Sequence, residues 1–233
     1  MMLNYYSNLD INGYKNCIKN YDISNNVNTI ILNDSLTLEK INDFKDDDEY
    51  NIIIDKIIKN LENVEKKEFI QNVSEIYLLD INDVLINKLL RKIIPYFEKN
   101  YNCYLKIIDF KLLKHLKGSH KKGAFLWHYD NHPRTINNII IYLNDVKENC
   151  GGFEYITINN EIVKQKFTKP AGCRHMDNFI KNNVVKINQV TGNKGTIFLF
   201  DNNIVHRAGS TTIKDRLAIL IQVFPSLKNN YEN

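Results

Sequence analysis

The chain has 233 residues, of which 43% are hydrophobic, and its formal net charge is +4 at pH 7. This length and apolar content predict a single domain, residues 1–233, with a sizeable core. The mild charge does not favour nucleic acid or an anionic membrane as a partner. No apolar run approaches the roughly 20 residues of a membrane span, and residues 1–13 lack a signal pattern. We therefore expect a cytoplasmic protein.

The four cysteines are widely spaced and form no Cys-x-x-Cys pair, which argues against a zinc ribbon or a redox dithiol. Reduced, unpaired cysteines are the expectation for a protein of the cytosol. The four residues are Cys17, Cys103, Cys150 and Cys173.

Residues 1–102 are predicted to form a mostly helical N-terminal part. Val27–Leu32 is a candidate early strand within it. The acidic run Asp46–Glu49 precedes an isoleucine-rich segment, and acids there would complement the positive end of a helix that runs to about Asn60.

A second helix is predicted for Asp83–Asn100, where apolar residues recur at helical spacing and Pro95 lies near the end. Residues 65–80 give no clear pattern. The two helices would brace the outside of a sheet.

From residue 103 onwards, short β-branched and aromatic runs alternate with turn residues. Such runs after helices predict an α+β protein with a mainly β core, residues 103–226, and buttressing N-terminal helices. The irregular stretch 159–190 is expected to be an insertion that covers the active site as a lid. We expect strands at Tyr104–Leu113, Ile136–Leu143, Gly151–Ile156, Gly195–Phe200 and Leu217–Phe224.

The candidate site centres on His128 and Asp130, which end an apolar run that begins at Phe125. In an extended segment, residues two apart point to the same face. His206 follows a later strand-like run, and Arg216 stands at the head of the next. Two histidines and one carboxylate cover one face of Fe(II) and leave the other face open for ligands.

Two other sites are possible from the pattern alone. His128 and His132 are four apart, as in zinc hydrolases with a His-Glu-x-x-His helix, but Tyr129 replaces the glutamate and Pro133 follows. Gly192–Thr196 lacks the spacing of a phosphate loop and predicts a hairpin turn.

From about Leu112 to Pro225, the sequence resembles the Fe(II)/2-oxoglutarate-dependent dioxygenase superfamily, and within it the phytanoyl-CoA dioxygenase branch. The resemblance implies a double-stranded β-helix, also called a jelly roll and similar to the cupins, with N-terminal helices against one sheet. The segments that carry the resemblance are Trp127–Asp130, Ile141–Val146, Asn149–Ile156, Lys194–Phe200 and His206–Arg216.

The resemblance implies that His128, Asp130 and His206 are catalytic and bind Fe(II). Arg216 would hold the distal carboxylate of 2-oxoglutarate, because its planar fork matches a carboxylate. Asn138 and Gln222 are candidates for further contacts to 2-oxoglutarate, although a cross-strand hydrogen bond would equally explain Asn138. The implied activity is hydroxylation of a C–H bond with O2, releasing succinate and CO2.

Three functional alternatives stay open. The substrate is expected to be a small molecule, and the basic stretch Lys111–Lys122 would suit an anionic one, unless its lysines are simply solvated. Prolyl hydroxylases share parts of the pattern, so a hydroxylase of protein side chains is the second reading, although these enzymes usually carry Lys at the position of Arg216. A non-catalytic jelly-roll binding module is the third.

Overall fold

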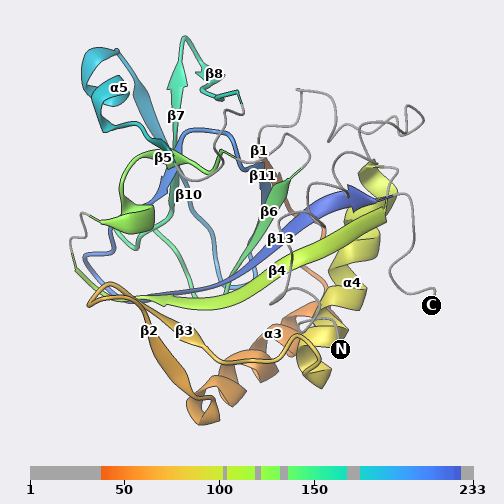
Figure 1. Cartoon of the computed structure of the whole chain (residues 1–233). Helices are drawn as coiled ribbons and strands as arrows, with labels where there is room; N and C mark the ends of the chain where they lie inside the picture. The colour runs from red at the N-terminus through yellow and green to blue at the C-terminus, as the bar shows by residue number, and fades with distance from the viewer. Residues whose placement is uncertain (1–37, 102–103, 119–121, 132–135, 167–173, 227–233) are drawn as a thin grey trace, which may run out of the picture.

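The computed structural model describes residues 38–101, 104–118, 122–131, 136–166 and 174–226. Within these residues, two antiparallel sheets form the core, and helices cover the outer side of the larger sheet (Figure 1). The strand expected at Val27–Leu32 lies outside the described residues.

Each sheet is built from strands that are distant in sequence. In the described residues, the larger sheet has the order β1 (Leu38–Ile41), β11 (Ile197–Asp201), β6 (Asn137–Tyr142), β13 (Arg216–Ser226), β4 (Tyr104–His115), β3 (Ser74–Tyr77) and β2 (Lys66–Ile70). The smaller sheet has the order β10 (Lys186–Val190), β7 (Phe153–Ile158), β12 (His206–Ala208), β5 (His128–Tyr129) and β9 (Arg174–His175), and β8 (Glu161–Ile162) pairs with β7.

The five expected strands are present as β4, β6, β7, β11 and β13, with bounds shifted by a few residues. The ambiguous segment 65–80 folds as a hairpin, β2–β3, which extends the larger sheet beside β4. The N-terminal part therefore contributes strands β1, β2 and β3 to the larger sheet as well as two helices.

The two predicted helices form where capping residues and apolar spacing coincide. Helix α3 (Asp48–Asn60) begins after Asp47, whose side chain accepts a hydrogen bond from the Tyr50 N–H at 2.9 Å. Helix α4 (Val84–Tyr101) follows Asp83, which caps it in the same way, and it continues past Pro95. Both helices bury one apolar side.

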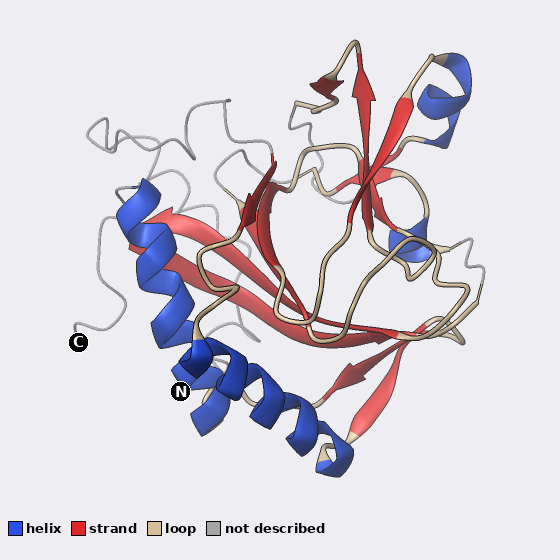
Figure 2. Ribbon diagram, turned by 180° about the vertical axis from the view of Figure 1, so that it is seen from behind, coloured by secondary structure: helices blue, strands red, loops and turns tan. Residues whose placement is uncertain are grey.

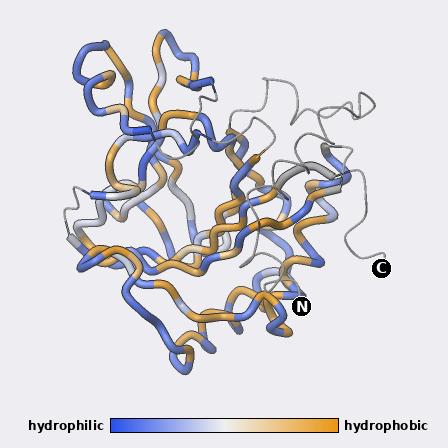
Figure 3. The backbone as a smooth tube through the Cα atoms, in the orientation of Figure 1, coloured by the Kyte–Doolittle hydropathy of each residue, from blue (hydrophilic) through white to orange (hydrophobic). Residues whose placement is uncertain are grey.

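Helices α3 and α4 pack against the outer side of the larger sheet (Figures 1 and 2). Alternation along each strand sends Ile139 and Ile141 of β6 towards the helices, whereas Asn138 and Ile140 line the cavity on the other side. Hydrophobic and hydrophilic residues accordingly alternate along the helices and long strands (Figure 3). The inner side of the larger sheet is thus available to build a site.

The smaller sheet has its own apolar cover on the side away from the cavity. Trp127, Ile156 and Val205 form a buried cluster there with residues of helix α5 (Asp177–Asn182). The guanidinium of Arg207 lies 4.3 Å from the centre of the Trp127 ring. Alternation on β12 therefore points Arg207 outwards and leaves His206 facing the cavity.

Five apolar residues of the 159–190 segment pack against this outer cluster, namely Val163, Met176, Phe179, Ile180 and Val185. None of the segment's described residues lines the cavity. Residues 167–173 lie outside the described residues, so the lid role stays a prediction.

The structure also bears on the expectations about cysteines and membrane spans, for the residues that it describes. Cys150 is a free, buried cysteine, whereas Cys17, Cys103 and Cys173 lie outside the described residues. None of the described helices combines the length and apolar character needed to cross a lipid bilayer.

Candidate metal centre

Two histidines on neighbouring strands form the middle of the candidate site. His128 begins β5 and His206 begins β12, and the two residues lie directly opposite each other in the antiparallel pair. Both are buried, and their ring centroids are 4.4 Å apart. Strand register therefore unites two residues that are distant in the sequence.

Each histidine ring is held by a backbone carbonyl two residues earlier. The Nδ1 atom of His128 lies 2.7 Å from the Leu126 oxygen, and that of His206 lies 2.9 Å from the Ile204 oxygen. A carbonyl only accepts, so each Nδ1 carries a proton, and in the neutral ring Nε2 keeps its lone pair. This is the arrangement of metal-binding histidines.

Asp130 completes the group of ligands. Its backbone N–H donates to the Asn202 carbonyl at 2.9 Å, and Asn138 Nδ2 donates to its Oδ2 at 3.4 Å. One atom each from His128, Asp130 and His206 can be chosen so that all lie within 4.8 Å of one another. The structure thus brings the three predicted ligands together, in a donor set that suits Fe(II).

The electrostatic surroundings differ between the two rings. Burial and the neighbouring His128 lower the pKa of His206 to about 4. Burial also acts to lower the pKa of His128, but the hydrogen bond and charge of Asp130 outweigh it, and the net shift is upwards. His206 is therefore neutral at pH 7, as a metal ligand must be.

Arg216 is the buried cation of the site, only 5% exposed at the start of β13. It donates one hydrogen bond from NH1 to the Gly151 carbonyl and one from NH2 to His115 Nδ1. Its Nε has no hydrogen-bond partner among the described residues. Burial lowers the pKa of Arg216, but a guanidinium stays charged at any physiological pH.

The acidic residues that could have paired with Arg216 are engaged elsewhere. Asp215 pairs with Lys114 at 2.8 Å, and Asp201 pairs with Lys164 at 2.8 Å. Among the described residues, no carboxylate forms an ion pair with Arg216. The charge of Glu154, which pairs with Arg207, acts to raise the pKa of Arg216. A buried guanidinium without an ion pair is still costly, so this position favours an anionic ligand.

Gly151 is needed where the chain passes Arg216. Its φ is +75°, and a Cβ at this position would lie 2.9 Å from the Gly209 oxygen. A larger residue would therefore move the carbonyl that accepts from Arg216.

Arg216 and the three predicted ligands line one cavity of about 180 Å³ between the sheets. Asn138 lines it as well, and so do Ala218 and Leu220, which lie on the same face of β13 as Arg216. Gln222 is absent from the lining, and its Nε2 instead lies 3.5 Å from Asn138 Oδ1. Contacts of Asn138 and Gln222 to 2-oxoglutarate stay predictions.

Sequence reasoning missed several residues of the cavity wall. His115 of β4, and Phe69 and Ile70 of β2, also line the cavity, and so does Lys111, which belongs to the basic stretch considered for an anionic substrate. Alternation along β4 would have placed Lys111, Leu113 and His115 on one face. The sequence carried no signal for the pairing of β4 with β13.

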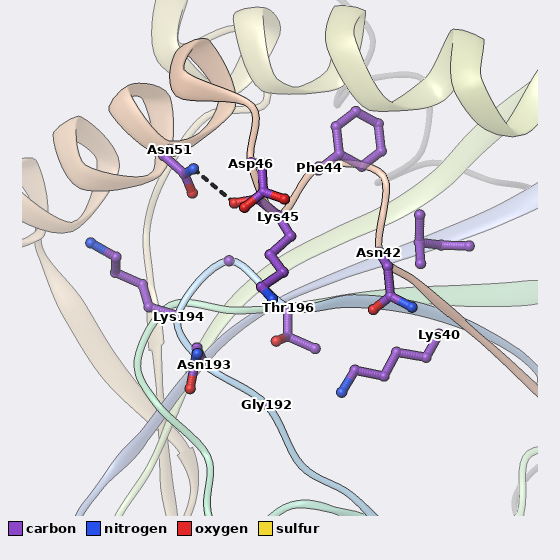
Figure 4. Close-up of a pocket in the computed structure, with 12 residues that line it drawn as sticks. Lys40, Asn42, Phe44, Lys45, Asp46, Asn51, Gly192, Asn193, Lys194 and Thr196 are labelled. Atoms are coloured by element: carbon purple, nitrogen blue, oxygen red, sulfur yellow. Dashed lines mark hydrogen bonds between the residues drawn. The ribbon is translucent and has the colours of Figure 1, made fainter.

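A larger cavity of about 410 Å³ lies apart from this site, at the turn 192–195 before β11 (Figure 4). Lys40, Lys45 and Lys194 line it and are exposed. Lys40 donates to the Thr191 carbonyl, and Lys194 pairs with Asp55. Among the described residues, the group that could hold a metal lies in the smaller cavity. Chemistry rather than size therefore identifies the candidate site.

The rival zinc site is not described by the structure, because His132 and Pro133 lie outside the described residues.

No family model and no curated protein matches this sequence. Among solved structures, it is similar to HygX from Streptomyces hygroscopicus with nickel and 2-oxoglutarate bound. The TM-score is 0.59 at 13% identity, over 85% of this chain and 87% of that one. It is also similar to the epimerase SnoN in complex with Fe3+, alpha ketoglutarate and nogalamycin RO. There the TM-score is 0.59 at 14% identity, over 82% and 79% of the two chains.

A third similar structure is EctD from S. alaskensis in its apoform, with a TM-score of 0.54 at 14% identity, over 82% of this chain and 73% of that one. Identities this low show the fold alone. They confirm the predicted mainly β jelly-roll fold. The phytanoyl-CoA dioxygenase branch stays a prediction.

Proposed function

We propose that this protein is an Fe(II)- and 2-oxoglutarate-dependent oxygenase that hydroxylates a C–H bond of a small molecule. The observation that carries the proposal is one cavity that holds three metal-ligand atoms and a buried arginine without a carboxylate partner among the described residues. A small diacid could bind the metal at one end and Arg216 at the other. The names of the structurally similar proteins, two of which mention 2-oxoglutarate, agree with this choice.

The residues fit this role on their own chemistry. His128, Asp130 and His206 would hold Fe(II), because Nδ1 of each neutral ring donates to a carbonyl, which leaves the Nε2 lone pair for the metal, and Asp130 supplies one negative charge. Arg216 would pair with the distal carboxylate of 2-oxoglutarate through N–H groups that the protein leaves unused. When bound, Fe(II) and 2-oxoglutarate supply the oxidising power for hydroxylation with O2, and succinate and CO2 are released.

The protein contributes binding, orientation and exclusion of water. The cavity is smaller than the roughly 300–1,000 Å³ of typical ligand pockets, so it suits a small co-substrate. The main substrate would bind at its opening. Apolar side chains such as Phe69 and Ile70 line the wall.

Lys111 is the candidate contact for an anionic substrate. Of the lysines between 111 and 122 that the structure describes, only Lys111 lines the cavity, and it also pairs with Asp109. Lys114 pairs with Asp215 instead. An anionic group on the substrate would therefore compete with Asp109 for Lys111.

The test is to add Fe(II) and 2-oxoglutarate to the purified protein without oxygen. We expect a weak visible absorption band from charge transfer between the metal and the bound ketoacid, absent in Asp130→Ala. Absence of the band in the unaltered protein, with no affinity for either component, would refute the proposal. Binding of both without succinate release, across small-molecule and peptide pools, would favour the non-catalytic module. Release driven by peptides alone would favour a protein hydroxylase.

A further inference from the structure

His115 and Arg216 form a buried cross-strand pair. They lie opposite each other in the register of β4 and β13, and they are 8% and 5% exposed. The Arg216 NH2 group donates a hydrogen bond to His115 Nδ1. Both side chains line the cavity that holds the metal-ligand group. His115 is therefore a neighbour of the proposed carboxylate site rather than part of a solvated basic loop.

The direction of this hydrogen bond defines what His115 does. A guanidinium has five N–H donors and no acceptor, so the Nδ1 that faces Arg216 must be unprotonated. The Gly151 carbonyl accepts from the other terminal nitrogen, NH1. Two acceptors thus fix both ends of the fork, and the buried Nε keeps no hydrogen-bond partner among the described residues.

We infer that His115 is a positioning residue, which holds the Arg216 guanidinium in the orientation that receives the distal carboxylate of the co-substrate. The inference rests on the proposed function. A bidentate pair depends on orientation, because two parallel N–H groups must meet two oxygens. An arginine side chain without such a fixed acceptor would lose rotamer freedom on binding, and binding would weaken.

A purely structural role makes a different prediction. The His115 ring packs against Phe125, with ring centroids 5.0 Å apart. If packing were its only role, an apolar residue of similar volume would replace it with no effect on ligand binding.

Two variants of His115 separate these roles. His115→Leu fills much of the same volume but has no acceptor. His115→Asn keeps an acceptor, because the asparagine Oδ1 is as many bonds from the backbone as the imidazole Nδ1. Arg216→Met is the reference for complete loss of the carboxylate contact.

The measurement is an anaerobic titration of the Fe(II)-loaded full chain with 2-oxoglutarate, followed by the visible absorption band. A parallel titration uses 2-oxobutyrate, which has the same chelating end but lacks the distal carboxylate. We expect His115→Leu to weaken 2-oxoglutarate binding about tenfold, and His115→Asn to restore most of it. The affinities for 2-oxobutyrate and for Fe(II) should stay within about twofold of the unaltered protein, since neither involves Arg216.

The weaker binding in His115→Leu should also appear in steady-state kinetics of 2-oxoglutarate decarboxylation without the main substrate. There, the KM for 2-oxoglutarate should rise and kcat should stay nearly unchanged. Unchanged 2-oxoglutarate affinity in His115→Leu, or an equal loss for 2-oxobutyrate, would overturn the inference. Equal weakening in the Leu and Asn variants would also overturn it. If Arg216→Met binds 2-oxoglutarate normally, or the unaltered protein binds none, the proposed function itself fails.

Discussion

The two ends of the cavity are held by different kinds of structure. At the metal end, the backbone positions the side chains: strand register places His128 opposite His206, and carbonyl oxygens fix both rings. At the arginine end, a side chain, His115, and the Gly151 carbonyl orient Arg216 on a long strand of the larger sheet. The metal end is therefore sensitive to the path of the chain, whereas the arginine end is tunable by single side chains.

The largest effect should come from removing a ligand at the metal end. His206→Ala takes away one of the three proposed protein ligands, so we expect Fe(II) affinity to fall at least about 100-fold. Equilibrium titration with Fe(II) under anaerobic conditions measures it. Circular dichroism that matches the unaltered protein is the control that the variant still folds. Retained Fe(II) affinity would mean that His206 is not a ligand.

Arg216→Met should remove only the pairing with the distal carboxylate at the arginine end of the cavity. Loss of a charge-assisted pair worth about 1.5–3 kcal/mol predicts 2-oxoglutarate binding weaker by roughly 10- to 150-fold. Fe(II) affinity should not change.

The same variant tests the cost of burying this cation. It removes an unpaired charge, which favours folding, and two hydrogen bonds, whose loss opposes it. Ligand-free stability in urea should therefore change by less than about 2 kcal/mol. A much larger loss would show that Arg216 serves mainly to hold the fold.

Asn138→Leu should have a smaller effect, confined to the metal end. Asn138 Nδ2 reaches Asp130 Oδ2 at 3.4 Å, a long hydrogen bond, so we expect Fe(II) affinity to fall about tenfold. Gln222→Leu, which loses only the contact to Asn138, is the matched control and should lose less. Weaker 2-oxoglutarate binding with normal Fe(II) affinity would instead support the contact to the co-substrate predicted from the sequence.

The smallest effect is expected in the second cavity. Lys45→Ala changes a side chain that lines this second cavity (Figure 4) and does not line the cavity that holds the metal-ligand group. Fe(II) and 2-oxoglutarate affinities should stay within about twofold, because solvent and salt screen exposed charges. Changes beyond that in the same titrations would show that the two cavities communicate.

The sequence was sufficient for features that depend on local pattern. Helix α3 could be predicted from its acidic start and isoleucine spacing, and His128 and Asp130 from an extended segment with two ligands on one face. Arg216 could be placed because it stands at the head of the strand-like run that follows His206.

Features that depend on long-range pairing could not be predicted. The hairpin β2–β3 was missed because the residues of β2 are mostly exposed, and the edge of β4 with which β3 pairs is a tertiary feature. His115 was assigned to a basic loop, since only the register of β4 against β13 places it beside Arg216. Strand partners and registers are set by the whole core, so one chain segment does not reveal them.

The pairing of His128 with His206 makes the length of the turn after β11 a chemical variable. Successive side chains on a strand face opposite ways, so a slip of β12 by one residue would exchange His206 for Val205 or Arg207 in the cavity. One residue inserted or deleted between Asp201 and Val205 would then yield a folded jelly roll that binds no iron. Loop length at this corner, and not only the identity of three side chains, decides whether the metal-ligand group can form.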